Sequence, residues 1–112
     1  LIQVMSNLLK NAMQAIESTH GREGGIIFLS TEEKNKEVHI RIKDNGCGIG
    51  KKDQAAIFEP GFTTKDLKDG TGIGLSLSRR LVRGAGGDIE LESSDDKGTI
   101  MLIRLPLHRA TE

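Results

Sequence analysis

Apolar residues recur along the first part of the chain at the spacing of a helix. Leu1, Met5, Leu8, Ala12 and Ile16 are separated by four, three, four and four positions. At about 100° per residue they share one face of a helix. The pattern predicts an amphipathic helix from residue 1 to about residue 17.

Alternating polar and apolar residues predict a β-hairpin after a glycine-containing loop. Its strands are expected over residues 26–32 and 37–44, on either side of the turn Lys34-Asn35-Lys36. In the second strand, apolar residues occupy every other position, which is typical of a strand with one buried side.

Asp44 continues the apolar phase of this second strand. Val38, Ile40 and Ile42 occupy the alternate positions before it, so strand geometry points the Asp44 carboxylate toward the buried side. A charge there is costly without a partner. Two uses are open: a binding group for a ligand, or a turn-forming aspartate before Asn45-Gly46.

The second half of the chain repeats the helix and strand signals. The expected elements are a short helix over 51–58, a loop over 59–72, a long helix over 73–85, and strands over 88–93 and 98–106. The order helix–strand–strand–helix–strand–strand predicts one domain, residues 1–112, with helices on one face of a largely antiparallel sheet.

Composition narrows the class of protein. The 16 basic and 16 acidic residues cancel, and 3% of residues are aromatic, so a nucleic-acid-binding protein is not expected. No apolar run is long enough to span a membrane and no secretory signal opens the chain. We expect a cytoplasmic domain without membrane contact, cut from a longer parent that is either membrane-anchored or not.

Glycine is the unusual residue. The chain holds 14 among 112 residues, against an average near 7%. Seven of them lie between positions 46 and 74: Gly46, Gly48, Gly50, Gly61, Gly70, Gly72 and Gly74. The segment matches neither the Walker loop nor the dinucleotide fingerprint. Polar residues interrupt these glycines, which predicts a backbone shaped for the close approach of a ligand.

Three features of the sequence fit an ATP site. The inward carboxylate of Asp44 can accept a hydrogen bond from an exocyclic amine. Asn7 and Asn11 supply neutral oxygens of the kind that bind Mg²⁺. Gly70-Thr71-Gly72 precedes a predicted helix, whose first N–H groups attract phosphate oxygens. Taken alone, the two asparagines also fit a second interpretation, in which they are ordinary polar residues of a helix.

Four motifs, in order, resemble those of bacterial sensor histidine kinases. These kinases belong to the GHKL superfamily, with DNA gyrase, a class of heat-shock chaperones and mismatch-repair ATPases. The motifs are similar to the N box (residues 7–12), the first glycine box (44–49), the F box with the start of the ATP lid (57–65), and the second glycine box (70–75). The resemblance implies the Bergerat fold, an α/β (α+β) two-layer sandwich whose mixed, largely antiparallel sheet carries helices on one face.

The resemblance also implies roles for individual residues. Asn11 is the implied Mg²⁺ ligand, Asn7 lies near the phosphates and takes part in catalysis, and Asp44 contacts adenine. Lys65 is implied to meet the terminal phosphate when the lid closes. The residues implied to bind the nucleotide through their backbone are Gly46, Gly48, Gly70, Gly72, Gly74 and Leu75, with the hydroxyl of Thr71 added.

The sequence departs from the superfamily pattern at two positions. Hydrolytic members place a general-base glutamate where this chain has Asn7, and a neutral amide cannot take a proton from water. This argues for transfer to an acceptor rather than hydrolysis. Gly61 replaces an aromatic residue of the lid. The context of residues 11–15 and the short lid sequence resemble the nitrogen-sensor type of kinase.

The phosphoacceptor is expected outside the chain. His20, His39 and His108 lack the helical setting of an acceptor histidine, so the resemblance implies an acceptor on a dimerisation domain that precedes residue 1. A response-regulator receiver domain is the implied downstream partner. Two alternatives stay open: a nucleotide-binding regulatory module without transfer activity, and a protein serine kinase of the anti-sigma-factor type.

Overall fold

In the part of the chain that the structure describes, four strands form one sheet in the order β1-β2-β4-β3. The computed structural model describes residues 2–20, 24–59 and 74–107. The strands are β1 (Ile27–Lys34), β2 (Glu37–Asp44), β3 (Asp88–Asp95) and β4 (Gly98–Pro106). Each of the three pairings among them is antiparallel, which confirms the expected architecture.

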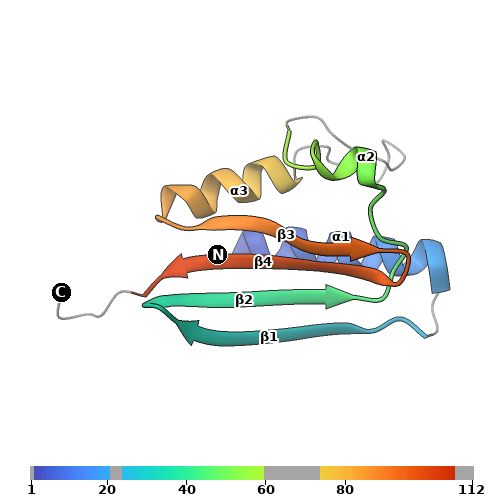
Figure 1. Cartoon of the computed structure of the whole chain (residues 1–112), viewed down its shortest axis with the longest axis horizontal. Coiled ribbons are helices and arrows are strands. Elements are labelled where there is room, and N and C mark those ends of the chain that lie inside the picture. Colours follow the sequence, from blue (N-terminus) through green and yellow to red (C-terminus); the bar gives the residue numbers. More distant parts are fainter. Residues whose placement is uncertain (1, 21–23, 60–73, 108–112) are drawn as a thin grey trace.

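Within the described ranges, three helices accompany the sheet: α1 (Ile2–His20), α2 (Lys51–Gln54) and α3 (Gly74–Gly84). In Figure 1, α1 runs behind the sheet and α3 lies along β3. Helix α1 contacts both β2 and α3, and α3 contacts β3. Among the described residues, no helix is both long and apolar enough to cross a membrane.

The core lies between the helices and one face of the sheet. Ile40 and Ile42 of β2 pair directly with Ile103 and Met101 of β4, and Ile89 of β3 pairs with Ile103 on the other side. These side chains therefore share one face. The buried helical residues packed on them are Val4, Leu8 and Ala12 of α1 and Val82 of α3. Leu8 and Ala12 belong to the apolar face predicted for the first helix.

Most predicted boundaries lie within three residues of those in the structure, and the end of the short helix differs by more. The turn predicted around Asn35 is a two-residue hairpin loop, in which Asn35 and Lys36 have φ values of 54° and 63°. The helix predicted over 51–58 is too long, because α2 ends at Gln54. Beyond it the amides of Ala56 and Glu59 bond to carbonyls three residues back, so the chain continues as turns rather than as an α-helix.

The opposite face of the sheet carries ion pairs across strands. Arg41 of β2 lies opposite Leu102 of β4. Its Nε donates to Glu92 of β3 at 2.9 Å, and its Nη1 donates to Glu32 of β1 at 3.0 Å. The arginine therefore links both edge strands and covers an apolar residue between them.

Asp88 connects α3 to the start of β3. Its Oδ1 accepts hydrogen bonds from the Nε of Arg79 and the Nε of Arg83, both at 3.0 Å. Burial alone raises the pKa of Asp88, but the bonds from Arg83, Arg79 and the Ile89 amide outweigh it and lower that pKa from 3.8 to about 2.

We expect Asp88 to stabilise the fold only while it is ionised. Because its pKa is lower in the folded chain, the stabilisation is complete above its ordinary pKa of 3.8 and is lost as the pH falls through about 2. Asp88→Asn should lower the free energy of unfolding by about 1 kcal/mol near neutral pH.

Urea denaturation at a series of pH values tests this. The difference between wild type and Asp88→Asn should shrink between about pH 4 and about pH 2. Asp96→Asn, which alters an exposed turn carboxylate, is the control and should have no such effect. A difference of constant size down to the lowest pH would contradict the role of the charge.

Candidate functional site

Asp44 ends β2 as a buried carboxylate. It is 7% exposed, and its strand partners are Ile27 on one side and Thr99 on the other. Its Oδ1 accepts a hydrogen bond of 2.9 Å from the amide of Gly46. The predicted inward orientation is confirmed, and so is the turn-forming use of this aspartate. One side chain therefore serves as a turn acceptor and as a buried charge.

The loop that follows Asp44 is packed tightly against α1. A Cβ atom on Gly46 would lie 2.6 Å from the backbone carbon of Ala15, and the amide of Cys47 donates to the Ala15 carbonyl at 3.3 Å. No side chain fits between this loop and the helix. The glycine at position 46 is thus required by the protein's own backbone.

The β3–β4 hairpin closes the other side of the same loop. Gly48 has a φ of +76°, and a Cβ there would lie 1.9 Å from the Asp95 carbonyl oxygen. A Cβ on Gly98 would lie 1.9 Å from the carbonyl oxygen of Asp44. Both contacts bring backbone against backbone, so the position of the loop is determined by glycines on two different segments.

Three polar side chains that the sequence analysis did not single out for the site hold this arrangement together. The amide of Ile49 donates to Ser94 Oγ at 2.7 Å, and Ser94 Oγ lies 2.8 Å from Thr99 Oγ1. Asn45 accepts from the amide of Ile26 at 2.8 Å and donates to the carbonyl of Gly24 at 2.9 Å. The periodicity of the sequence does not predict these partners, because the bonds of Asn45 and the Ile49–Ser94 bond join residues distant in the sequence.

Asn7 and Asn11 lie one helical turn apart on α1, and both are half-buried. The amide nitrogen of Asn7 donates to Ser78 Oγ of α3 at 3.2 Å, and Ser78 is fully buried. Ala15, the residue against Gly46, continues the same face by one more turn. This face of α1 therefore extends from α3 to the loop after Asp44, and it carries both asparagines.

The remaining predicted site residues divide into two groups. Lys65, Gly70, Thr71 and Gly72 lie outside the described residues. Gly74 begins α3, and the side chain of Leu75 is half-buried against the core. The start of α3 was predicted to offer backbone N–H groups to a ligand. The same helix accepts the hydrogen bond from Asn7 through Ser78.

The donor set fits a magnesium ion that arrives with phosphates. Within the described ranges, no group of three or more His, Cys, Asp or Glu side chains is placed to hold a metal. The oxygens on the asparagine face of α1 are neutral amides. Mg²⁺ is commonly held by few protein ligands, several waters and substrate phosphates, so Asn11 suits such a shared ion better than a metal held by protein alone.

A family model described as "Histidine kinase-, DNA gyrase B-, and HSP90-like ATPase" matches residues 1–109. Among curated relatives, the signal transduction histidine-protein kinase AtoS of Escherichia coli K12 is 40% identical over 96% of this chain and 17% of its own length. The sensor histidine kinase ZraS of Salmonella typhi is 40% identical over 96% of this chain and 22% of its own length. The sensor protein TorS of Escherichia coli K12 is 34% identical over 97% of this chain and 11% of its own length.

Solved structures agree with the fold. The catalytic domain of histidine kinase ThkA, in a nucleotide-free form, superposes with a TM-score of 0.76 at 32% identity, over 93% of this chain and 64% of that one. The mycobacterial sensor histidine kinase MprB superposes with a TM-score of 0.74 at 23% identity, over 93% of this chain and 70% of that one, which supports the fold alone. The chain spans between about a tenth and a quarter of the length of these curated relatives.

Proposed function

The chain belongs to the histidine kinase-, DNA gyrase B- and HSP90-like ATPase family, and from this membership we propose that it donates the γ-phosphoryl group of ATP–Mg²⁺ to a histidine on a separate domain. The family relationship supports an ATP-binding kinase or ATPase domain. The proposal goes beyond the family relationship in three respects: the acceptor is a histidine, Mg²⁺ takes part, and the acceptor lies on a separate domain.

The buried carboxylate of Asp44 is the observation that carries the proposal. A carboxylate at 7% exposure is costly unless several donors satisfy it. The Gly46 amide supplies one donor. A carboxylate has about four acceptor positions, so it can also accept from the exocyclic amine of adenine. Gly46 and Gly48 are proposed to keep the backbone beside the base free of side chains.

The asparagine face of α1 is proposed to hold the phosphate end of the nucleotide. Asn11 would contribute an amide oxygen to Mg²⁺, and Asn7 would lie beside the phosphates, oriented by its bond to Ser78. The ion, when bound, neutralises charge on the transferred phosphoryl group. Backbone N–H groups at the start of α3, together with Gly70, Thr71, Gly72 and Lys65, are proposed to complete the phosphate site.

The identity of residue 7 supports transfer rather than hydrolysis. Asn7 occupies the position from which hydrolytic members of the superfamily supply a glutamate, and an amide cannot deprotonate water. The relatives AtoS and ZraS carry histidine kinase in their names, which favours histidine over serine as the acceptor. The proposed partners are a dimerisation domain of the same protein and, downstream, a response-regulator receiver domain.

Replacing the proposed metal ligand should weaken nucleotide binding only when Mg²⁺ is present. In calorimetric titration with a non-hydrolysable ATP analogue, Asn11→Ala should weaken binding at least about tenfold in the presence of Mg²⁺. With EDTA in place of Mg²⁺, the mutant and wild type should bind nearly alike. Gln3→Ala, which removes an exposed amide from the same helix, is the matched control. Equal weakening with and without the ion would refute the ligand role.

A labelling experiment tests the acceptor. Wild-type chain with γ-labelled ATP–Mg²⁺ should label a dimerisation domain supplied separately, and the label should be lost in acid and kept in base, as for phosphohistidine. The chain alone should stay unlabelled. Nucleotide binding without any labelled acceptor would instead favour a regulatory module. Label that resists acid and is lost in base would favour a serine kinase.

A further inference from the structure

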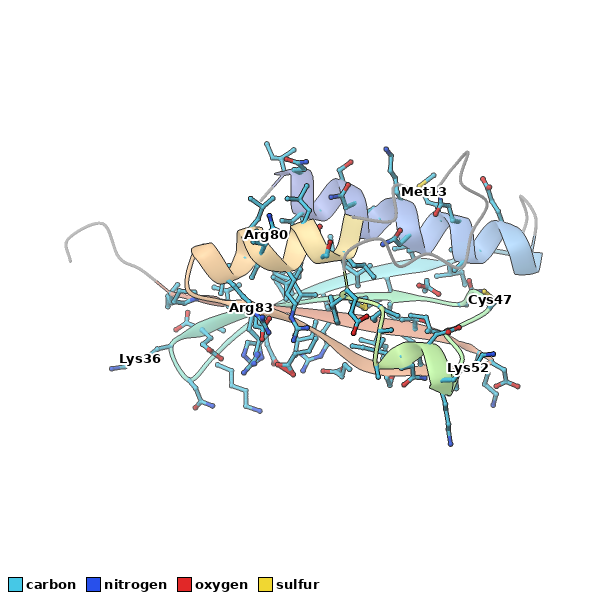
Figure 2. The ribbon with its side chains drawn as sticks, turned by 90° about the horizontal axis from the view of Figure 1, so that it is seen from above. Met13, Lys36, Cys47, Lys52, Arg80 and Arg83 are labelled. Carbon is cyan, nitrogen blue, oxygen red and sulfur yellow. The ribbon has the colours of Figure 1, made fainter. Side chains whose placement is uncertain are left out.

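A cluster of arginines lies on the exposed side of α3. Arg79, Arg80 and Arg83, with Ser76 one turn earlier, line a shallow open groove of about 270 Å³ whose remaining wall is Phe58. Figure 2 labels Arg80 and Arg83 on this helix. Positions three and four apart are neighbours on a helix surface, so the charged side chains form one patch, named here the arginine groove.

Positive charge exceeds negative charge in this groove. Three guanidinium groups line it, and one carboxylate, Asp88, bonds two of them, which leaves an excess of two positive charges. The chain as a whole has a net charge of zero, so the excess is local. Arg80 is exposed and has no ion-pair partner within the described part of the chain.

Two of the three arginines are held in place. The guanidinium carbon of Arg79 lies 4.3 Å from the centre of the Phe58 ring, while its Nε donates to Asp88. Arg83 donates to the same carboxylate. Arg79 uses its Nε, and Arg83 uses its Nε and, at 3.5 Å, its Nη2, so both guanidinium groups are kept oriented. A ligand that binds the terminal nitrogens then has less side-chain freedom to restrict.

We propose that the arginine groove docks an acidic helical segment of a partner protein. Arg79 and Arg83 are four residues apart, which is about 6 Å along the helix axis. Glutamates four residues apart on a partner helix have the same spacing, and carboxylates pair with guanidinium forks through two hydrogen bonds. A single phosphate group would need the forks to converge on one point, and Asp88 already occupies that point.

The position of the groove connects it with the proposed kinase activity. Phe58 comes two residues before, and Ser76 three residues after, the segment 60–73, which includes part of the predicted ATP lid. If the proposed function holds, a partner helix docked in this groove contacts residues that are close in sequence to the predicted lid. The docking itself rests on the arginines and on Asp88, not on nucleotide binding.

A synthetic helix of about 20 residues with glutamates at every fourth position is the probe. Fluorescence anisotropy should detect its binding to the wild-type chain, and Arg80→Glu should weaken it about tenfold. Lys52→Glu, which makes the same charge change on exposed α2, should leave the affinity unchanged. In NMR spectra, the Nε–Hε signals of Arg79 and Arg83 should shift on binding, and a glutamine version of the peptide should have no effect.

Three results would overturn the docking proposal. One is equal weakening by Arg80→Glu and Lys52→Glu, which would indicate unspecific attraction. Another is arginine signals that do not shift while the peptide binds. The third is occupation of the groove by inorganic phosphate or a single-stranded oligonucleotide, but not by the peptide. Titration of the same variants with the ATP analogue reports separately on the proposed function, so failure of one proposal is distinguishable from failure of the other.

Discussion

The buried carboxylate of Asp44 is the constraint on which the rest of the site depends. Buried carboxyl oxygens at the inner end of a strand need donors, and the amide of Gly46 provides one at 2.9 Å. To place that amide, the chain must turn at once after β2. The turn brings the next residues against Ala15 of α1 on one side and against Asp95 on the other. The position of the loop between helix and hairpin thus satisfies both the Asp44 carboxylate and the close backbone contacts at the glycines.

The glycines show how one residue type serves fold and site together. Their clustering predicted the close approach of a ligand to the backbone, whereas in the structure Gly46, Gly48 and Gly98 each face the protein's own backbone. The same absence of side chains is what the proposed adenine contact requires. Because a side chain at these positions would clash with backbone atoms, substitution there should disturb folding as well as the proposed binding.

Local patterns predicted the elements, because α1 and β2 each bury one face whose period is visible in the sequence. Asp44 was placed inward by the same argument. The end of α2 was predicted incorrectly, since the shift from helix to turns after Gln54 changes the bonding by only one residue. The bonds of Arg41 were not predictable, because its partners lie on two other strands and depend on the register of the sheet. Those of Asn45 and the Ser94–Ile49 bond join loops to other segments, which only the tertiary structure brings together.

The most direct test exchanges the Asp44 carboxylate for an amide. In Asp44→Asn the side-chain oxygen can still accept from Gly46, so the free energy of unfolding should stay within about 1 kcal/mol of wild type. Its amide nitrogen would then face the amino group of adenine, donor against donor, and affinity for an ATP analogue should fall at least about tenfold. A folded Asp44→Asn chain that binds the analogue as tightly as wild type would contradict the account.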